Sequence, residues 1–306
     1  MMMDRCACLL MSLLCLLAWA HQTTAQNLTV LRTIGAEGDE VLLHRPIDVV
    51  WFSDGRACLL NQGDCSLAEF TPDGDLLAEH SRKGEAPGEL SMPDALLLVG
   101  NEVWVKMPAS FAVFDSHLDH LRTVHIPPGI GSVASADSCL LGVQPFSNEI
   151  GLRLDLAGRP RETFGPTLVQ GEDAVDLLRA TSWKVVAGSG SLALVDCFEG
   201  RVWVPGPLGA PLLNLDLSRG KVQGPSRIKR VVTSLCPDRQ GGWLVTTHAR
   251  EQAMLVRYDA SWRKDWVLEL PAEIPGGIVR AAPEGRIWFL NDSSSIVWIC
   301  RLTSEP

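Results

Sequence analysis

The 306-residue chain lacks the short motifs by which many enzymes are recognised. It contains no GxSxG nucleophile elbow, no HExxH zinc motif and no phosphate-binding P-loop. It has a single tyrosine, Tyr258, and its seven histidines do not recur at equivalent positions. These absences argue against the commonest hydrolase and nucleotide-binding classes.

Positive charge is also scarce. The chain has 27 lysines and arginines against 36 aspartates and glutamates, a formal net charge of -9 and a pI of about 5.3. An acidic protein repels phosphate, so we expect no nucleic-acid partner. The hydrophobic share of 46% is that of an ordinary globular protein rather than of a disordered one.

Long apolar runs are missing after the first 20 residues. Residues 6–19 are nearly all apolar, and Ala18 to Ala20 form a small-x-small cleavage pattern. This arrangement predicts a signal peptide over residues 1–20 and a single domain over 21–306, secreted or periplasmic, with no membrane span after the signal is removed. The alternative, an uncleaved membrane anchor, is disfavoured because the run is short for a transmembrane helix.

Paired CxxC spacings are absent too, which disfavours a zinc site. Six cysteines follow the leader: Cys58, Cys65, Cys139, Cys197, Cys236 and Cys300. An even number in an oxidising compartment permits disulfides. We favour buried thiols, because a core of this size needs no covalent cross-links.

What the chain does contain is a repeat of glycine turns and short apolar strands. Its clearest copy is KGEAPGELSMPDALLLVGNEVWV, from Lys83 to Val105. The first turn of each unit is expected at Gly55, Gly100, Asp137, Gly200, Gly242 and Gly285. A period of about 40 to 50 residues predicts a repeat architecture. We therefore expect an all-β fold, a six-bladed β-propeller of four-stranded antiparallel blades, closed by the N-terminal strand joining the last blade.

Three finer features follow from the same repeat. The long step from Asp137 to Gly200 predicts an inserted helix or loop at 171–182. Tryptophans recurring on the second strand are expected to pack between blades: Trp104, Trp203, Trp243 and Trp288. Aspartates ending the third strand are expected to bond the following turn: Asp115, Asp155, Asp216 and Asp259.

The repeat resembles NHL-type and related bacterial six-bladed β-propellers. The resemblance is carried by Gly84 to Leu90, then Pro93, then Glu102 to Val105 and Phe111 to Phe114. It implies the fold for the whole mature chain. Relatives of this kind include binding scaffolds, peptide-amidating lyases, antibiotic-inactivating lyases and sugar-lactone hydrolases, so the resemblance does not imply one activity.

A propeller binds ligands around its central channel, where the inner strands begin. Residues expected at that rim are Asp48, Asp94, Lys106, Arg230, His248 and Asp292. We assign none of them as catalytic or as a metal ligand. A cluster of His117, His120 and His125 is better explained as an exposed outer edge than as a metal site.

Three functions are compatible with these residues. The leading hypothesis is a monomeric binding module for a protein, peptide or glycan, without catalysis and without a cofactor. The second is a divalent-metal-dependent hydrolase or lyase, with Ca or Zn held in the channel by Asp48, Asn291 and Asp292. The third is a structural or sensory partner within an envelope complex.

Overall fold

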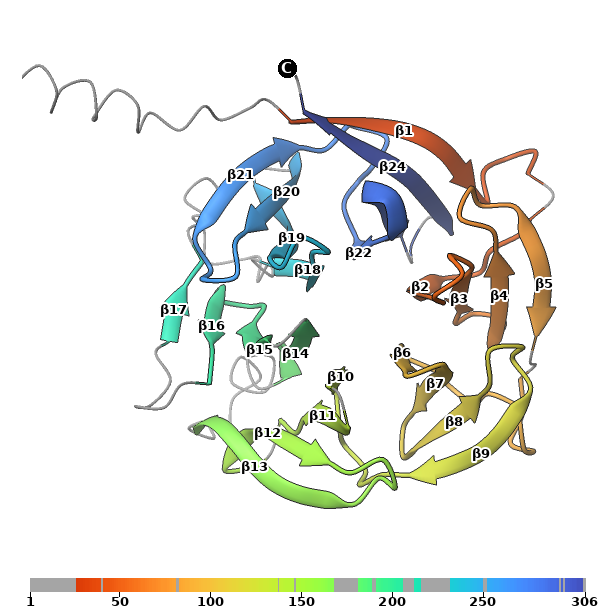
Figure 1. The fold of residues 1–306 in the computed structure, drawn as a ribbon, viewed down its shortest axis with the longest axis vertical. Coiled ribbons are helices and arrows are strands. Elements are labelled where there is room, and N and C mark those ends of the chain that lie inside the picture. Colours follow the sequence, from red (N-terminus) through yellow and green to blue (C-terminus); the bar gives the residue numbers. More distant parts are fainter. Residues whose placement is uncertain are drawn as a thin grey trace, which may run out of the picture.

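The chain folds into a ring of six antiparallel sheets (Figure 1). The computed structural model describes residues 26–39, 41–80, 83–136, 138–145, 147–167, 181–188, 191–205, 212–215, 232–249, 252–291, 293 and 295–304. Each sheet has four strands, which confirms the predicted six-bladed β-propeller. The predicted leader lies outside the described residues, as does the predicted insertion except for its last two positions.

The first three blades follow the repeat read from the sequence. Blade 1 contains β2 (Pro46–Trp51), β3 (Ala57–Asn61), β4 (Ser66–Phe70) and β5 (Leu76–His80). Blade 2 contains β6 (Ala95–Val99), β7 (Glu102–Met107), β8 (Ser110–Phe114) and β9 (His120–His125). Blade 3 contains β10 (Val133–Ala136), β11 (Cys139–Val143), β12 (Glu149–Leu154) and β13 (Pro160–Thr167). In each blade the middle strands are mostly buried on both faces, so they appear in the sequence as continuous apolar runs.

The remaining three blades complete the ring. Blade 4 contains β14 (Trp183–Gly188), β15 (Ser191–Asp196), β16 (Arg201–Trp203) and β17 (Leu212–Asn214). Blade 5 contains β18 (Val232–Pro237), β19 (Trp243–Ala249), β20 (Gln252–Tyr258) and β21 (Lys264–Glu269). Blade 6 contains β22 (Ile278–Ala281), the 3₁₀ turn η1 (Pro283–Gly285), β23 (Arg286–Asn291), β24 (Ile296–Ser304) and, as its outermost strand, β1 (Gln26–Ile34).

In blade 4 the assignment of strands from the sequence was wrong by one strand. The inner strand is β14 and the second strand is β15, so Gly200, which the sequence placed in the first turn of the blade, lies in the second turn, between β15 and β16. Trp203 accordingly belongs to the third strand. No Asp-Gly or Asn-Gly pair, the signal of a tight hairpin, stands between β14 and β15 in the sequence, so the sequence does not predict a strand over residues 183–188.

Blade 6 joins the two ends of the chain. β1 pairs antiparallel with β24, from Gln26 opposite Ser304 to Ile34 opposite Val297, with one bulge (Figure 1). Pairing of this kind leaves blade 6 with as many strands as its neighbours.

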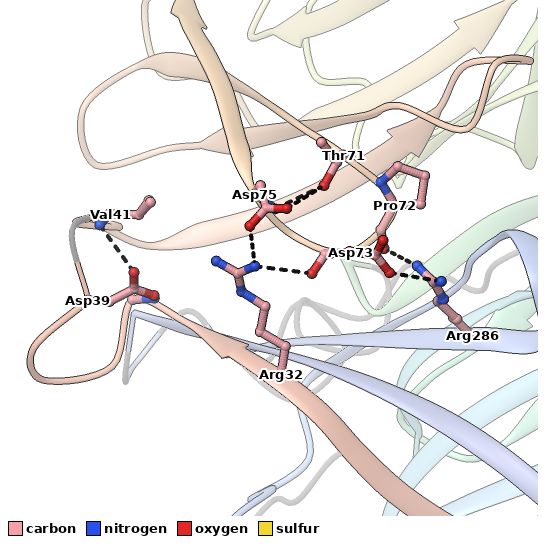
Figure 2. A network of polar contacts seen from close by, with 9 residues as sticks. Arg32, Asp39, Val41, Thr71, Pro72, Asp73, Asp75 and Arg286 are labelled. Carbon is pink, nitrogen blue, oxygen red and sulfur yellow. Dashed lines mark hydrogen bonds and ion pairs between the residues drawn. The ribbon is translucent and has the colours of Figure 1, made fainter.

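A polar network holds this closing blade against blade 1 (Figure 2). Arg32 of β1 donates to the carboxylate of Asp75 and to the carbonyl of Asp73, while Arg286 of β23 pairs with the Asp73 carboxylate at 2.9 Å. Gly74, between the two aspartates, has φ +90°, and a Cβ there would lie 2.6 Å from Cδ1 of Ile299. A larger residue at this turn would therefore push the two blades apart.

The core lies between the blades. Trp104, Trp243 and Trp288 are fully buried on second strands, as predicted, and Trp288 meets Phe70 of blade 1 edge to face, with ring centroids 6.2 Å apart. The predicted capping aspartates also behave as expected in three blades, where Asp115, Asp155 and Asp259 each accept two backbone N–H bonds from the following turn. Asp216 lies outside the described residues. None of the described residues belongs to a helix long and apolar enough to cross a membrane.

Candidate functional site

The six inner strands, β2, β6, β10, β14, β18 and β22, face the centre of the ring (Figure 1). Their side chains line a central channel of about 650 Å³. All the inner strands begin at the same end of the channel, which we call the upper mouth; the strands end at the lower mouth. Asp94 and Ser132 lie at the upper mouth, and Pro237 and Arg239 lie at the lower one. A channel of this volume is in the range of small-ligand sites.

Two of the predicted rim residues meet at the upper mouth. The Lys106 ammonium lies 2.6 Å from Oδ2 of Asp94, and the Asp94 backbone N–H donates to the Lys106 carbonyl. The lysine side chain is only 2% exposed, whereas that of the aspartate is 45% exposed. Burial raises the pKa of Asp94 above its ordinary value, because its effect outweighs the hydrogen bond from Lys106. The pair thus presents a carboxylate to the channel and keeps its counter-charge inside the blade.

The third described rim residue, Asp48, has a different environment. Its Oδ1 accepts from Nε of Arg280 at 2.8 Å and from the Val49 N–H, and its Oδ2 accepts from the Leu96 N–H at 2.9 Å. These partners come from blades 6, 1 and 2, so one buried carboxylate ties three successive blades together. Burial of Arg280 disfavours its charged form, but the nearby Asp48 carboxylate holds the pKa of the Arg280 guanidinium above its ordinary value.

Serine hydroxyls make similar contacts between other blades. Ser234 of blade 5 accepts from the Val279 N–H of blade 6 at 3.3 Å, and Ser132 before blade 3 accepts from the Val185 N–H of blade 4. In each case a side-chain oxygen beside one inner strand receives a backbone donor of the next. We conclude that much of the polar lining of the channel is structural.

The other predicted rim residues are not brought together by the described structure. Arg230 and Asp292 lie outside the described residues, and for His248 only the backbone, within β19, is described. Asn291 ends β23, and its Oδ1 accepts from the Ser293 N–H. The proposed metal set of Asp48, Asn291 and Asp292 is therefore left with two members whose oxygens already have donors.

Gln62, which the sequence did not single out, joins the loops at the upper mouth. Its backbone N–H donates to the Arg45 carbonyl, and its side-chain amide donates to the Pro93 carbonyl at 2.7 Å. A carbonyl only accepts, so the NH₂ group must face Pro93 and Oε1 must face away. This Oε1 is buried and has no hydrogen-bond partner among the described residues, although Gln62 lines the channel. Such an acceptor needs a donor from elsewhere.

The two loops that Gln62 joins are both strained. Arg45 and Met92 each precede a proline that leads into an inner strand, and their φ values are +63° and +49°. A side chain before proline normally adopts an extended conformation, so this left-handed geometry is costly at both positions. Strain of this kind is retained when the surrounding structure fixes it, and it gathers at ligand-binding loops. Met92 remains 68% exposed, as does Leu42, at 70%, in the loop before β2.

The described residues do not gather three or more potential metal ligands in one place. His120 and His125 sit at the two ends of the outer strand β9, in keeping with an exposed edge. Among the cysteines, burial raises the pKa of Cys236 to about 11 and that of Cys300 to about 12. Thiols this basic are poor nucleophiles at neutral pH.

Signals for the missed residues were present in part. A basic residue inside an apolar inner strand, Arg280 in IVRA, predicts a buried ion pair, and its partner Asp48 was already a candidate. Arg45-Pro46 and Met92-Pro93 stand at the same point of their repeats. No feature of the sequence around Gln62 indicated that it would bond to a loop 31 residues away.

Comparisons with known proteins define the class of fold. No family model matches the chain, and no curated protein matches it. Solved structures do: a candidate exported protein of Bacteroides fragilis (TM-score 0.61, 10% identity, covering 93% of this chain and 97% of that one) and a DUF4221 family member of Bacteroides vulgatus (0.59, 10%, 93% and 100%). Virginiamycin B lyase from Staphylococcus aureus is similar to the same degree (0.58, 9%, 91% and 100%). At these identities the similarity establishes a β-propeller and no activity.

Proposed function

We propose that this protein is a propeller binding module that holds a peptide or a segment of a protein at the upper mouth. The proposal is carried by two acceptors of the channel lining: the buried Oε1 of Gln62, which has no hydrogen-bond partner among the described residues, and the half-exposed carboxylate of Asp94. An extended peptide brings backbone N–H donors for both acceptors. Leaving a buried acceptor unsatisfied costs about 1 to 3 kcal/mol, which a ligand donor would recover.

The apolar residues of the same loops favour a peptide over a glycan. Leu42 and Met92 expose most of their side chains in the connections that lead into blades 1 and 2. Methionine adapts to irregular apolar partners and is common at peptide-binding surfaces. The strained backbone at Arg45 and Met92 supports a rim that is arranged before the ligand arrives, which lowers the entropic cost of binding.

Binding is favoured over catalysis because serine hydroxyls of the channel and the Asp48 carboxylate already have structural partners. Ser135 donates to the Leu98 carbonyl of the neighbouring blade, and Ser132 accepts from Val185. Both oxygens of Asp48 are occupied by donors. The alternative of a metal-dependent hydrolase or lyase has support from the similarity to virginiamycin B lyase, and elemental analysis of purified protein tests it. About one tightly held Ca or Zn per chain would favour the enzyme.

The experiment for the peptide proposal is selection from a displayed library of random peptides. We expect selected peptides to bind the protein and to lose at least about tenfold in affinity on Met92→Asp, which places a charge at the apolar rim. The matched control is Leu121→Asp, an equally drastic change at an exposed leucine of the outer strand β9. Equal losses in the two variants, or no selectable peptide, would contradict the proposal.

Three finer assignments belong to the same proposal. The repeats are of the NHL type, on the residues from Gly84 to Phe114 that resemble that family. The protein is secreted or periplasmic, which is supported by the apolar leader and by the candidate exported protein among the similar structures. It acts as a monomer, because closure of the ring leaves few strand edges available for pairing.

A further inference from the structure

Two hydrogen-bond acceptors of the channel lining are left open at the upper mouth. One is Oε1 of Gln62, which is buried without a donor among the described residues because its amide NH₂ group faces the Pro93 carbonyl. The other is Oδ1 of Asp94. The ammonium of Lys106 reaches only Oδ2, at 2.6 Å, and the described residues supply no donor to Oδ1. Both side chains line the channel, so a ligand that enters there can reach them.

A third acceptor belongs to an imidazole–carboxylate pair in the loop before β2. Nδ1 of His44 lies 2.8 Å and 2.9 Å from the two carboxylate oxygens of Asp64. A carboxylate only accepts, so in the neutral imidazole Nδ1 carries the hydrogen and Nε2 presents a lone pair. The described residues give Nε2 no partner, and the His44 side chain is 60% exposed. This nitrogen is therefore open to a donor from a ligand.

A buried amide holds the imidazole–carboxylate pair in place. Asn61 is fully buried, and its Oδ1 accepts from the His44 backbone N–H at 2.7 Å while its Nδ2 donates to Oδ2 of Asp64 at 2.9 Å. Gly63 donates its N–H to the His44 carbonyl, and a Cβ at this glycine would lie 2.5 Å from that oxygen. The direction of the imidazole is thus set by contacts within the fold.

The acceptors of His44, Gln62 and Asp94 form a continuous strip over blades 1 and 2, which we call the acceptor strip. The residue after Gln62, Gly63, bonds to the His44 carbonyl through its backbone N–H. The Gln62 side chain in turn donates to Pro93, which directly precedes Asp94. One ligand group, or two neighbouring groups of one segment, can therefore contact several of these acceptors.

The basic side chains of the channel lining do not offset these acceptors. Arg280 is paired with Asp48 at 2.8 Å, and Arg45 and Lys184 also have partners. Arg239 lies at the lower mouth, at the opposite end of the channel. A ligand at the upper mouth accordingly meets open acceptors beside basic groups that are already engaged.

We infer that the segment held at the upper mouth brings a cationic N–H donor to the acceptor strip, either an ammonium of a lysine side chain or of an amino terminus, or the guanidinium of an arginine. The inference rests on the proposed function and adds the charge of the ligand. Such cations carry several N–H donors, and their hydrogen bonds to carboxylates are about twice as strong as neutral ones. The net charge of -9 also attracts a basic segment from solution.

The test measures fluorescence anisotropy of short labelled peptides on the purified protein. An acetylated peptide of alternating leucine and lysine is compared with its arginine, glutamine and glutamate analogues. A glutamine analogue with a free amino terminus tests that source of charge separately. We expect at least one cationic peptide to bind at least about tenfold more tightly than the neutral acetylated one, and the glutamate peptide to bind least.

Variants then distinguish the acceptor strip from the overall charge of the protein. Asp94→Asn keeps the shape of the side chain and should weaken the cationic peptide about five- to tenfold. His44→Phe removes Nε2 at an exposed position and should cause a smaller loss, of about two- to threefold. The matched control is Glu79→Gln, which removes one negative charge from the exposed side of β5 in blade 1 and should change nothing. Urea unfolding of each variant shows that it is folded.

The outcomes separate this inference from the proposal on which it rests. Equal binding of cationic and glutamate peptides, or equal losses from Asp94→Asn and Glu79→Gln, would overturn the inference. Neutral library peptides that depend on Met92 would leave the peptide-binding function standing and overturn only the inference. A carboxylate at position 92 would itself attract cations, so Met92→Gln is the rim variant for the cationic peptides. Binding that depends on Asp94 and is unchanged in Met92→Gln would support the acceptor strip and contradict the apolar rim.

Discussion

Two ion pairs in one channel show how similar residues can serve different ends. Asp48 with Arg280 and Asp94 with Lys106 each join an aspartate beside an inner strand to a basic side chain. The Asp48 side chain is 6% exposed and its oxygens accept donors from three blades, while that of Asp94 is 45% exposed. The Asp48 pair therefore has a structural role, because its oxygens all have donors within the fold. The Asp94 pair leaves a carboxylate acceptor facing the channel.

The pKa shifts of the two pairs reflect the same difference between a structural pair and a half-exposed one. In the first, the Asp48 carboxylate raises the pKa of Arg280 despite the opposing effect of burial. In the second, burial raises the pKa of Asp94 and its lysine only partly offsets the effect. Burial without saturating hydrogen bonds is the usual condition of a binding group.

The largest effect that would test this contrast is expected from Arg280→Met. The change leaves Asp48 buried without its cation, so the free energy of unfolding should fall by about 3 kcal/mol. Urea unfolding measures it, with Arg263→Met in an exposed turn as the control. A loss no larger than that of the control would mean that the Asp48 pair does not hold the blades together.

Ser234→Ala should have an intermediate effect. It removes the hydroxyl that accepts from the Val279 N–H at 3.3 Å and from Nη1 of Arg280 at 3.4 Å. Because Val279 is fully buried, its N–H is left unsatisfied, and we expect a loss of about 1 to 2 kcal/mol. Ser261→Ala, at an exposed turn, is the matched control in the same unfolding experiment. Indistinguishable unfolding curves would show that this contact between blades is dispensable.

Lys106→Met should cost at most about 1 kcal/mol, although the lysine is the more deeply buried cation. The reason is that the half-exposed Asp94 can be hydrated when its partner is removed, whereas Asp48 cannot. Comparison of its unfolding midpoint with that of Arg280→Met is the measurement. If both methionine variants lose stability equally, the two pairs have the same role.

The smallest expected effect is a dependence on pH. The folded pKa of Asp94 is raised, so the folded protein binds a proton more tightly than the unfolded chain does. Stability from this group is therefore present below the unfolded value of 3.8 and is lost as pH rises through the folded pKa. The stability of the wild type relative to Asp94→Asn should fall over that range by less than about 1 kcal/mol, since water screens the carboxyl. A relative stability that rises with pH would reverse the sign of the shift.

The fold was predictable because the same structural unit is repeated several times along the sequence. Glycine turns and apolar strands recur in all six units, so an error in one does not change the architecture. Blade 4 shows the limit: the sequence did not predict β14, which contains Trp183 and Lys184 and begins directly after the predicted insertion at 171–182. The repeat period of the apolar strands was enough to predict the fold, but it was not enough to identify every strand within one blade.

The candidate site was predictable only where chemistry coincided with the strand pattern. Asp94 and Lys106 were found because a charge at the end of an apolar strand stands out. The role of Gln62 depends on a contact between two loops of different blades, which tertiary packing creates and no local pattern encodes. The sequence also does not show that Asp48 is buried while Asp94 is half-exposed, because the burial of a carboxylate depends on residues distant in the chain.

The pairing of β1 with β24 also has a consequence for the order in which the protein is made. Because β1 pairs with β24, it acquires its partner only after every blade between the two strands has been synthesised. Until then β1 is an unpaired edge, and contacts so far apart along the chain form slowly. Removal of the last part of β24, residues 300–304, would therefore leave residues 26–30 of β1 without a partner.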